Sequence, residues 1–249
     1  MSFFLSLKFL LAILRGVSSQ VGCPTPPFKS PYLYLSECPY VVSVLTKDHL
    51  SSNLLILDLS KNGLTSLAEN FFNNSKNLEN LVLNQNQFTF LGKRIFTVLH
   101  KLTTLALSSN SLSEIEDGLL DGLRDLQFLD LAYNRLTSLN FDVFKDLAQL
   151  TGLFLQGNYI KSLSYSSRLN LTNLLYLALE GNQLSSFGED FFKAFVNLEA
   201  LGLHSNRFSS LDEFYFRHLA ALKTLYLFNN SIEMIAPGAF NELQELTLL

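Results

Sequence analysis

The feature that most constrains this chain is a period of 24 residues, which runs without insertion or deletion through most of its 249 residues. Each unit opens on a leucine and carries an asparagine eight positions later. A fixed period of this length predicts a solenoid, in which every repeat forms one coil that stacks on the next. The opening leucines are Leu54, Leu78, Leu102, Leu126, Leu150, Leu174, Leu198, Leu222 and Leu246, and the asparagines are Asn62, Asn86, Asn110, Asn134, Asn158, Asn182, Asn206 and Asn230.

Alternation within a unit separates its inner from its outer residues. In residues 126–136, LQFLDLAYNRL, Leu129 and Leu131 are two positions apart, so they point to one side of a short strand. Phe128 and Asp130 then point to the other side. A single unit cannot bury its leucine face, so each coil needs a neighbour above and below.

The repeated asparagine lies where the chain leaves the strand and turns. Backbone groups that face the inside of the coil at this point need hydrogen-bond partners. An asparagine side chain offers an acceptor and two donors, so it can bridge its own turn to the next coil. We expect a continuous internal ladder, in which Asn62→Leu or Asn134→Leu would orphan backbone groups at roughly 1–3 kcal/mol each.

A second apolar stripe follows each opening leucine by eighteen residues. We interpret it as an aromatic spine that fills the core on the side opposite the strands. In the fifth repeat the position holds Arg168, so either Leu169 substitutes for the missing ring or the loop bulges. The members are Phe72, Phe96, Leu120, Phe144, Phe192, Phe216 and Phe240.

The N-terminal segment reads as a secretion signal spanning residues 1–19. Lys8 precedes an apolar run at residues 9–14, and residues 17–19 are small enough for cleavage before Gln20. An uncut anchor is the alternative, but no run of about 20 apolar residues exists to span a bilayer. We expect a secreted protein, or the outer part of a cell-surface protein.

Two cysteines, Cys23 and Cys38, follow this segment. In a secreted chain they predict a disulfide whose loop of about 15 residues contributes roughly 3 kcal/mol; two free thiols are the alternative. Counting back 24 from the first repeat puts Leu33 and Leu35 on inward positions and Cys38 on the ladder position. Residues 20–53 are therefore expected to form an N-terminal cap in register with the repeats at 54–249.

Charge and sequons bear on partners. The net charge is −4, with no cluster of lysine and arginine, which argues against nucleic acid as a partner. Three N-x-[ST] sequons, at Asn73, Asn170 and Asn229, fit a secreted glycoprotein. We expect a glycan at Asn229 to crowd the neighbouring strand end, so its use is the least favoured.

The complete pattern, LxxLxLxxNxLxxLxxxxFxxLxxL over residues 54–249, resembles the extracellular "typical" leucine-rich repeat class. Toll-like receptor ectodomains, variable lymphocyte receptors and chaoptin-type adhesion proteins share it. The resemblance implies an α/β-type repeat solenoid, curved as a horseshoe, with a parallel β-sheet on the concave face and short or irregular segments on the convex side. Members typically act by binding ligands and not by catalysis, so the resemblance implies a binding protein. The cap departs from the family, whose module often carries four cysteines.

The outward strand residues of the concave face can be changed without harm to the core. The aromatic ones among them lie in repeats four to eight. Aromatic side chains among small residues are typical of a protein-recognition surface; lateral packing that stabilises the sheet is the alternative. The candidate ligand-binding residues are Phe128, Asp130, Tyr133, Phe154, Tyr176, Glu180, His204, Tyr226 and Phe228.

The charged members of this face carry no catalytic signature. Asp130 and Glu180 lie two strands apart, roughly 10 Å, which is too far to share a proton. His204 has no serine, cysteine or metal partner in view, and we read it as a solvated surface residue. We find no nucleophile elbow, HExxH helix or phosphate loop. We therefore expect no enzyme, cofactor or metal site.

The leading hypothesis is an extracellular recognition module, the ectodomain of an innate-immune or cell-surface receptor, that binds a protein or other macromolecule on its concave sheet. The alternative is a structural adhesion or matrix protein that acts by homotypic assembly. The chain stops inside a ninth repeat at Leu249. We expect a fragment that lacks its C-terminal cap, or an oligomer formed through the uncapped edge.

Overall fold

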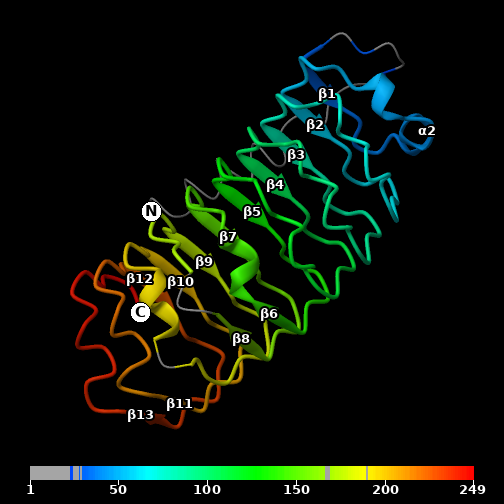
Figure 1. Cartoon of the computed structure of the whole chain (residues 1–249). Coiled ribbons are helices and arrows are strands. Elements are labelled where there is room, and N and C mark those ends of the chain that lie inside the picture. Colours follow the sequence, from blue (N-terminus) through cyan, green and yellow to red (C-terminus); the bar gives the residue numbers. More distant parts are fainter. Residues whose placement is uncertain (1–22, 25–27, 29, 166–168, 189) are drawn as a thin grey trace.

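The computed structural model describes residues 23, 24, 28, 30–165, 169–188 and 190–249. Its coils stack into an elongated solenoid with one strand from each coil along the same face (Figure 1). These strands form a parallel nine-stranded sheet in the order β1-β2-β3-β4-β5-β7-β9-β10-β12. Their bounds are β1 Tyr32–Tyr34, β2 Ile56–Asp58, β3 Asn80–Val82, β4 Thr104–Ala106, β5 Phe128–Asp130, β7 Gly152–Phe154, β9 Tyr176–Ala178, β10 Ala200–Gly202 and β12 Thr224–Tyr226.

Register in this sheet follows the sequence period. Leu129 of β5 pairs with Leu105 on one side and with Leu153 on the other, each 24 residues away. The leucines at this position point into the core and are almost completely buried. Burial of this continuous apolar face is what holds each coil to its neighbours. The predicted solenoid is confirmed, and we call the outward side of the sheet the concave face.

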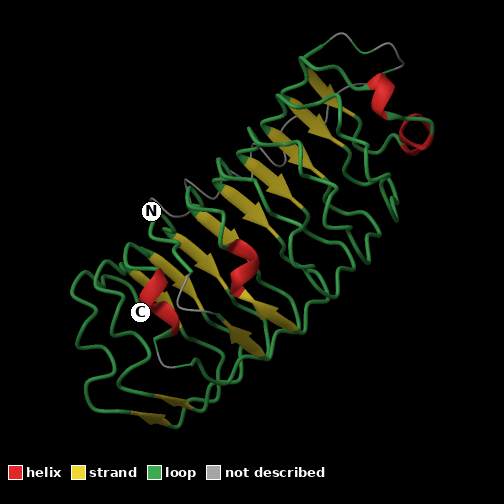
Figure 2. Ribbon diagram, in the orientation of Figure 1, coloured by secondary structure: helices red, strands yellow, loops and turns green. Residues whose placement is uncertain are grey.

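The side opposite the sheet consists of loops with a few short elements (Figure 2). Two pairs of short parallel strands connect neighbouring coils there. Among the described residues, no helix is long and apolar enough to cross a membrane. The elements outside the main sheet are α2 Pro39–Ser43, η1 Lys47–His49, β6 Ser138–Asn140, η2 Phe141–Phe144, β8 Ser162–Ser164, η3 Phe191–Ala194, β11 Ser210–Leu211 and β13 Met234–Ile235.

The asparagine ladder forms as predicted. Asn134 donates through Nδ2 to the carbonyls of Leu107 (3.0 Å) and Leu131 (3.1 Å), and its Oδ1 accepts from the N–H of Leu112 (3.0 Å). One side chain thus joins its own turn to the preceding coil. The same pattern recurs along the solenoid to Asn230, whose Oδ1 accepts from the N–H of Phe208.

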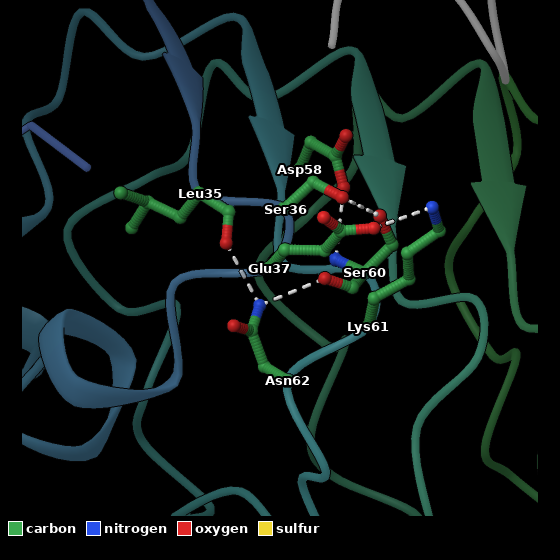
Figure 3. Close-up of polar contacts among 7 residues, drawn as sticks. All are labelled: Leu35, Ser36, Glu37, Asp58, Ser60, Lys61 and Asn62. Atoms are coloured by element: carbon green, nitrogen blue, oxygen red, sulfur yellow. Dashed lines mark hydrogen bonds and ion pairs between the residues drawn. The ribbon is translucent and has the colours of Figure 1, made fainter. Parts of the chain in front are cut away.

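The ladder is incomplete at its first rung, Asn62, whose contact with the Leu35 carbonyl is drawn in Figure 3. Asn62 donates to the carbonyls of Leu35 (2.8 Å) and Leu59 (2.9 Å). Its Oδ1 is buried and has no hydrogen-bond donor in the part of the chain that the structure describes. The reason is the preceding coil, where Cys38 donates its N–H to Leu35 and the chain then enters α2.

The aromatic spine is present and buried on both sides of its predicted gap. Phe72 and Phe96 stand 6.0 Å apart between ring centroids, and Phe192 and Phe216 stand 6.2 Å apart. Phe240 is only partly buried but stacks on Phe216.

At the gap in the spine, Arg168 lies outside the described residues. Leu169 is buried in the core, which agrees with the substitution by leucine. The rings of Phe141 and Phe191 also meet across this repeat, 5.1 Å apart edge to face. Aromatic contact between the flanking coils therefore closes the space that a phenylalanine fills elsewhere.

The segment before the first repeat continues the sheet. β1 pairs with β2 in parallel, Leu33 opposite Leu57, so the predicted register is confirmed. Cys23 and Cys38 form a disulfide with a Cα–Cα separation of 5.7 Å, and Cys38 is buried at the ladder position. The predicted signal, residues 1–19, lies outside the described residues, and the domain boundaries remain a proposal.

Candidate functional site

The polypeptide leaves each strand of the concave face through a left-handed turn just before the ladder asparagine. Tyr133, Ser205 and Asn229 occupy this position with φ of 54°, 57° and 54°. In the two coils between them it is Gly157 and Gly181, with φ of 68° and 64°. Glycine adopts this conformation without steric cost. These two glycines also leave the turn without side chains in the middle of the solenoid.

The space above Gly157 is used by the preceding coil. A Cβ built on Gly157 would lie 2.5 Å from a ring carbon of Tyr133, so the ring lies directly on this glycine. Above Gly181 the nearest atoms are the backbone of Gly157. Tyr133 is 60% exposed. The turn region is therefore a shallow floor with one aromatic ring at its N-terminal end.

The two ends of the concave face differ in chemistry. The outward positions of β2 to β4 and the residues that follow them are mainly small or polar: Ile56, Asp58, Ser60, Asn80, Val82, Asn84, Thr104, Ala106 and Ser108. From β5 onward five of the fifteen corresponding positions are aromatic: Phe128, Phe154, Tyr176, Tyr226 and Phe228. This division agrees with the expectation from the sequence.

Three residues of the aromatic part pack on one another. Phe154 and Ala178 form a small buried cluster, with Phe128 packed against it. Gly152 permits this packing, because a Cβ there would approach the ring of Phe128 to 2.9 Å. Phe154 is only 5% exposed. For Phe128 and Phe154, lateral packing thus accounts for the aromatic side chains.

A second group of aromatic residues reaches solvent. Phe228 is 62% exposed and stacks on His204, with ring centroids 4.3 Å apart and an interplanar angle of 15°. Tyr226 meets His204 edge to face at 6.2 Å. Tyr176 is half-buried on β9. His204 is therefore held between rings and is not the freely solvated residue that the sequence suggested.

Polar side chains form a column beside the glycine floor. Gln156, Glu180 and His204 are spaced by 24 residues, and each lies two positions after the end of its strand, β7, β9 or β10. Gln156 Oε1, Glu180 Oε2 and His204 Nδ1 are covered from solvent, and none has a hydrogen-bond partner among the described residues. A buried polar atom without a partner costs about 1–3 kcal/mol. Three such atoms in adjacent coils make this column unfavourable for folding.

Glu180 is the centre of this column. Burial raises the pKa of its carboxyl above the usual 4.5, opposed by a backbone hydrogen bond and by His204. The carboxylate folds over Gly202, where a Cβ would lie 2.3 Å from Oε2. Any side chain at position 202 would displace it. Gly202 therefore sets the position of the Glu180 carboxylate.

Asp130 lies apart from this column. Burial raises the pKa of its carboxyl, while hydrogen bonds from the Ala132 N–H and the Ser108 hydroxyl lower it. Its Oδ1 accepts from the Ala132 N–H at 3.0 Å, which fixes the turn after β5. β7 separates β5 from β9, so Asp130 and Glu180 are two strands apart as predicted. Asp130 shapes the strand end and does not join Glu180 in one site.

The structure thus places Tyr133, Glu180, His204 and Phe228 along the edge of the sheet where the strands end at their carboxyl termini. Gln156, which the candidate set omitted, lies along the same edge. The sequence carries a signal for this site: Gly157, Gly181 and Gly202 hold outward or turn positions in three adjacent repeats. Among the described residues, no group of three His, Cys, Asp or Glu could hold a metal ion. The groups that this arrangement presents to solvent are the exposed rings of Tyr133 and Phe228, which are of the kind enriched in recognition surfaces.

The repeat pattern and the fold are matched by a family model described as leucine rich repeat, over residues 52–112, 76–136, 100–160, 129–184, 149–208 and 196–249. These matches overlap and together cover the repeats from end to end. The chain belongs to the leucine-rich repeat family. No protein of curated function matches the chain in sequence.

Solved structures of the same architecture are similar to most of this chain. A leucine-rich repeat protein of Leptospira interrogans superimposes with a TM-score of 0.70 at 27% identity, over 85% of this chain and 57% of its own. A chain of the Drosophila Toll–Spatzle complex gives 0.72 at 27% identity, over 82% and 28%. A chain of the complex of Latrophilin 3, Unc5D and FLRT2 gives 0.72 at 26%, over 80% and 61%. The chain therefore spans less than two thirds of each of these proteins.

Proposed function

We propose that this protein is an extracellular recognition module that binds a protein partner on its concave face, as the ectodomain of a cell-surface or innate-immune receptor. The observation that supports the proposal is the pair of exposed rings of Tyr133 and Phe228, with the half-buried Glu180 and His204 in the coils between them. Exposed aromatic rings on a protein surface are typical of contact sites. A partner that covers the rings of Tyr133 and Phe228 removes them from water.

The similar structures support an interaction role. Toll is solved with Spatzle, and FLRT2 with Latrophilin 3 and Unc5D, so solenoids of this kind assemble with other proteins. The Toll–Spatzle title places that complex in Drosophila development and innate immunity. A receptor role and an extracellular location for the present chain are our inference from these relatives, the disulfide and the predicted signal. We expect no catalytic activity, in keeping with a family of binding modules.

The test compares two pairs of exposed aromatic residues. The full chain, labelled with a fluorophore, is used to select binders from a yeast-displayed library of extracellular protein domains. The variant Tyr133→Ala/Phe228→Ala removes both exposed rings of the concave site. The matched control, Phe90→Ala/Phe214→Ala, removes two phenylalanines of similar exposure, 49% and 47%, that lie outside the sheet. Phe154 is unsuitable because its burial makes truncation a test of stability.

We expect the concave variant to lower the affinity of selected partners at least tenfold, since truncation of an aromatic anchor typically costs more than about 1 kcal/mol. The control should stay within about twofold of the wild type. Equal effects of the two variants, or a loss confined to the control, would contradict a concave binding site. Concentration-dependent size in light scattering, without partner binding, would favour homotypic assembly.

Glycosylation is part of the same proposal. Asn73 and Asn170 are exposed and lie away from the sheet, where a glycan leaves the concave face free. Asn229 is also exposed, but its Nδ2 donates to the Ser205 hydroxyl (2.9 Å) and it directly follows Phe228. We propose that Asn73 and Asn170 carry glycans and that Asn229 does not.

A further inference from the structure

The first repeat lacks an apolar side chain at a core position that the other complete repeats fill. Twenty-one residues after its opening leucine it carries Ser75. This side chain is 0% exposed, and its hydroxyl has no hydrogen-bond partner among the described residues. A buried hydroxyl without a partner lowers stability, so Ser75 is unfavourable for the core. The corresponding residues of the other repeats, all of them buried, are Leu99, Leu123, Leu147, Leu171, Phe195, Leu219 and Leu243.

Ser75 is also the hydroxyl residue of the sequon that begins at Asn73. In the sequons of the fifth and eighth repeats the hydroxyl residue, Thr172 or Ser231, is exposed, and the residue before it points into the coil. Of the three sequons, all of them described, only the first places its hydroxyl in the core. The residue that the core disfavours is thus the one that the sequon requires.

The turn that holds this sequon presents Asn73 to solvent and hides Ser75. Asn73 is exposed, and its N–H donates to the Asn70 carbonyl (3.1 Å). The N–H of Ser75 donates to the carbonyl of Phe72 (2.8 Å), and the carbonyl of Ser75 accepts from the N–H of Leu78 (3.0 Å). These bonds hold the serine in place, so its hydroxyl reaches solvent only when the repeat opens.

N-glycosylation needs both ends of a sequon. The asparagine Nδ2 loses a proton and forms a bond to the anomeric carbon of an oligosaccharide, whose bond to the diphosphate of its lipid carrier breaks. The transferase binds the acceptor segment in an extended conformation and contacts the hydroxyl of the serine or threonine. A segment that is folded into a turn, with its hydroxyl in the core, does not offer these contacts.

We propose that Asn73 is glycosylated from a lipid-linked oligosaccharide before the first repeat folds, and that packing of Ser75 into the core then closes the site to the transferase. This inference rests on the extracellular location and the Asn73 glycan of the proposed function. It adds the stage of folding at which the glycan is attached and the residue that sets this stage. Ser75 serves the sequon at the expense of the core.

The experiment compares two sequons in the same loop. The full chain is synthesised in a cell-free system, and a purified oligosaccharyltransferase with its lipid-linked oligosaccharide is added either during synthesis or after the chain has folded. The variant Asn73→Gln/Lys76→Thr moves the sequon by one residue, so that Asn74 is the acceptor, Ser75 is the middle residue and the hydroxyl lies at the exposed position 76. Mass spectrometry of peptides measures the occupancy of each site.

With the transferase present during synthesis, we expect Asn73 of the wild type and Asn74 of the variant both to be occupied. On the folded chains, Asn73 should react at least about tenfold more slowly than Asn74 of the variant, because it waits for the repeat to open. Circular dichroism establishes that both chains are folded. Equal rates on the folded chains overturn the proposal, and so does an Asn73 that stays unmodified during synthesis.

The cost of Ser75 to the core is measured on chains without glycans. Ser75→Ala removes the unpaired hydroxyl without adding volume, so its melting temperature should exceed that of the wild type. Asn73→Gln is the control, since it removes the acceptor, keeps Ser75 and should leave the melting temperature unchanged. A lower melting temperature of Ser75→Ala would show that the hydroxyl stabilises the core, which contradicts the role given to it.

The outcomes separate this inference from the proposed function. If folded Asn73 reacts as fast as Asn74 of the variant while Tyr133→Ala/Phe228→Ala abolishes partner binding, the concave recognition surface stands without the inference. If that double variant binds its partners normally, the concave site fails, whatever the glycosylation result.

Discussion

At the scale of residues, the concave face contains a buried carboxyl that lowers the stability of the fold. Glu180 is buried beside Gly202 with an unpaired oxygen, and burial raises its pKa. A carboxyl whose pKa is raised in the folded state binds its proton more tightly there than in the unfolded chain. The contribution of Glu180 to stability is therefore greatest at low pH and falls as pH rises through the interval between its unfolded-state and folded-state pKa values. At neutral pH the raised pKa of Glu180 therefore opposes folding.

The raised pKa of Glu180 predicts that Glu180→Gln stabilises the protein. Glutamine has nearly the same shape and carries no charge, so the variant avoids the burial of a carboxylate. Its melting temperature should exceed that of the wild type at pH 7, and the difference should shrink at pH 4, below the ordinary pKa of 4.5. Thermal unfolding at the two pH values measures this. A lower melting temperature of the variant at pH 7 would contradict the account of Glu180.

The pKa of Asp190 is shifted in the opposite direction to that of Glu180. Hydrogen bonds from Arg217 and His218 lower the pKa of its carboxyl to about 2. Its contribution to stability is thus present above the ordinary value of 3.8 and is lost as pH falls towards 2. Asp190→Asn should lower the melting temperature at pH 7 and have little effect near pH 2. An equal loss at both pH values would show that packing, and not the charge, is responsible.

At the scale of elements, each coil is fixed to its neighbour by the same set of contacts, so positions in the ladder can be compared directly. The carbonyls that Asn134 and Asn62 bind each keep another donor, such as Asn158 for Leu131 and Asn86 for Leu59. The difference lies in Oδ1. In Asn134 it is the acceptor for the N–H of Leu112, whereas in Asn62 it has no donor among the described residues.

The ladder therefore predicts unequal costs for two equal substitutions. Asn134→Leu leaves the Leu112 N–H buried and unpaired, at about 1–3 kcal/mol. Asn62→Leu orphans no N–H group, so it should cost less. Chemical denaturation of both variants measures the free energies of unfolding. Equal or reversed costs would contradict the interpretation of the first rung.

The sequence predicts whatever repeats with the period. Leu129 faces inward, Asn134 joins the ladder and Cys38 meets the same position in the cap, because one coil repeats the geometry of the last. The exposure of side chains on the outer face depends instead on the neighbouring coils. Phe154 is buried because Gly152 and Ala178 leave room for rings beside it, while Tyr133 is exposed because it lies on a glycine. The contact between Phe141 and Phe191 likewise skips a repeat and has no periodic signal.

At the scale of the whole molecule, stacking produces a rigid surface on which side chains from distant parts of the sequence are aligned. Tyr133 and Phe228 are far apart in sequence, but both follow the carboxyl ends of strands in the same sheet. Because each coil contacts mainly its neighbours, the outward residues can change without loss of the fold. The central claim is that this face, and not the convex side, meets the partner.

Hydroxyl-radical footprinting of the protein, alone and with a selected partner, tests that claim most directly. Aromatic side chains react according to their exposure, and four exposed rings report on the two sides of the solenoid. We predict that the partner protects Tyr133 and Phe228 and leaves the oxidation of Phe90 and Phe214 unchanged. Protection of Phe90 and Phe214, with Tyr133 and Phe228 still reactive, would contradict a concave recognition surface.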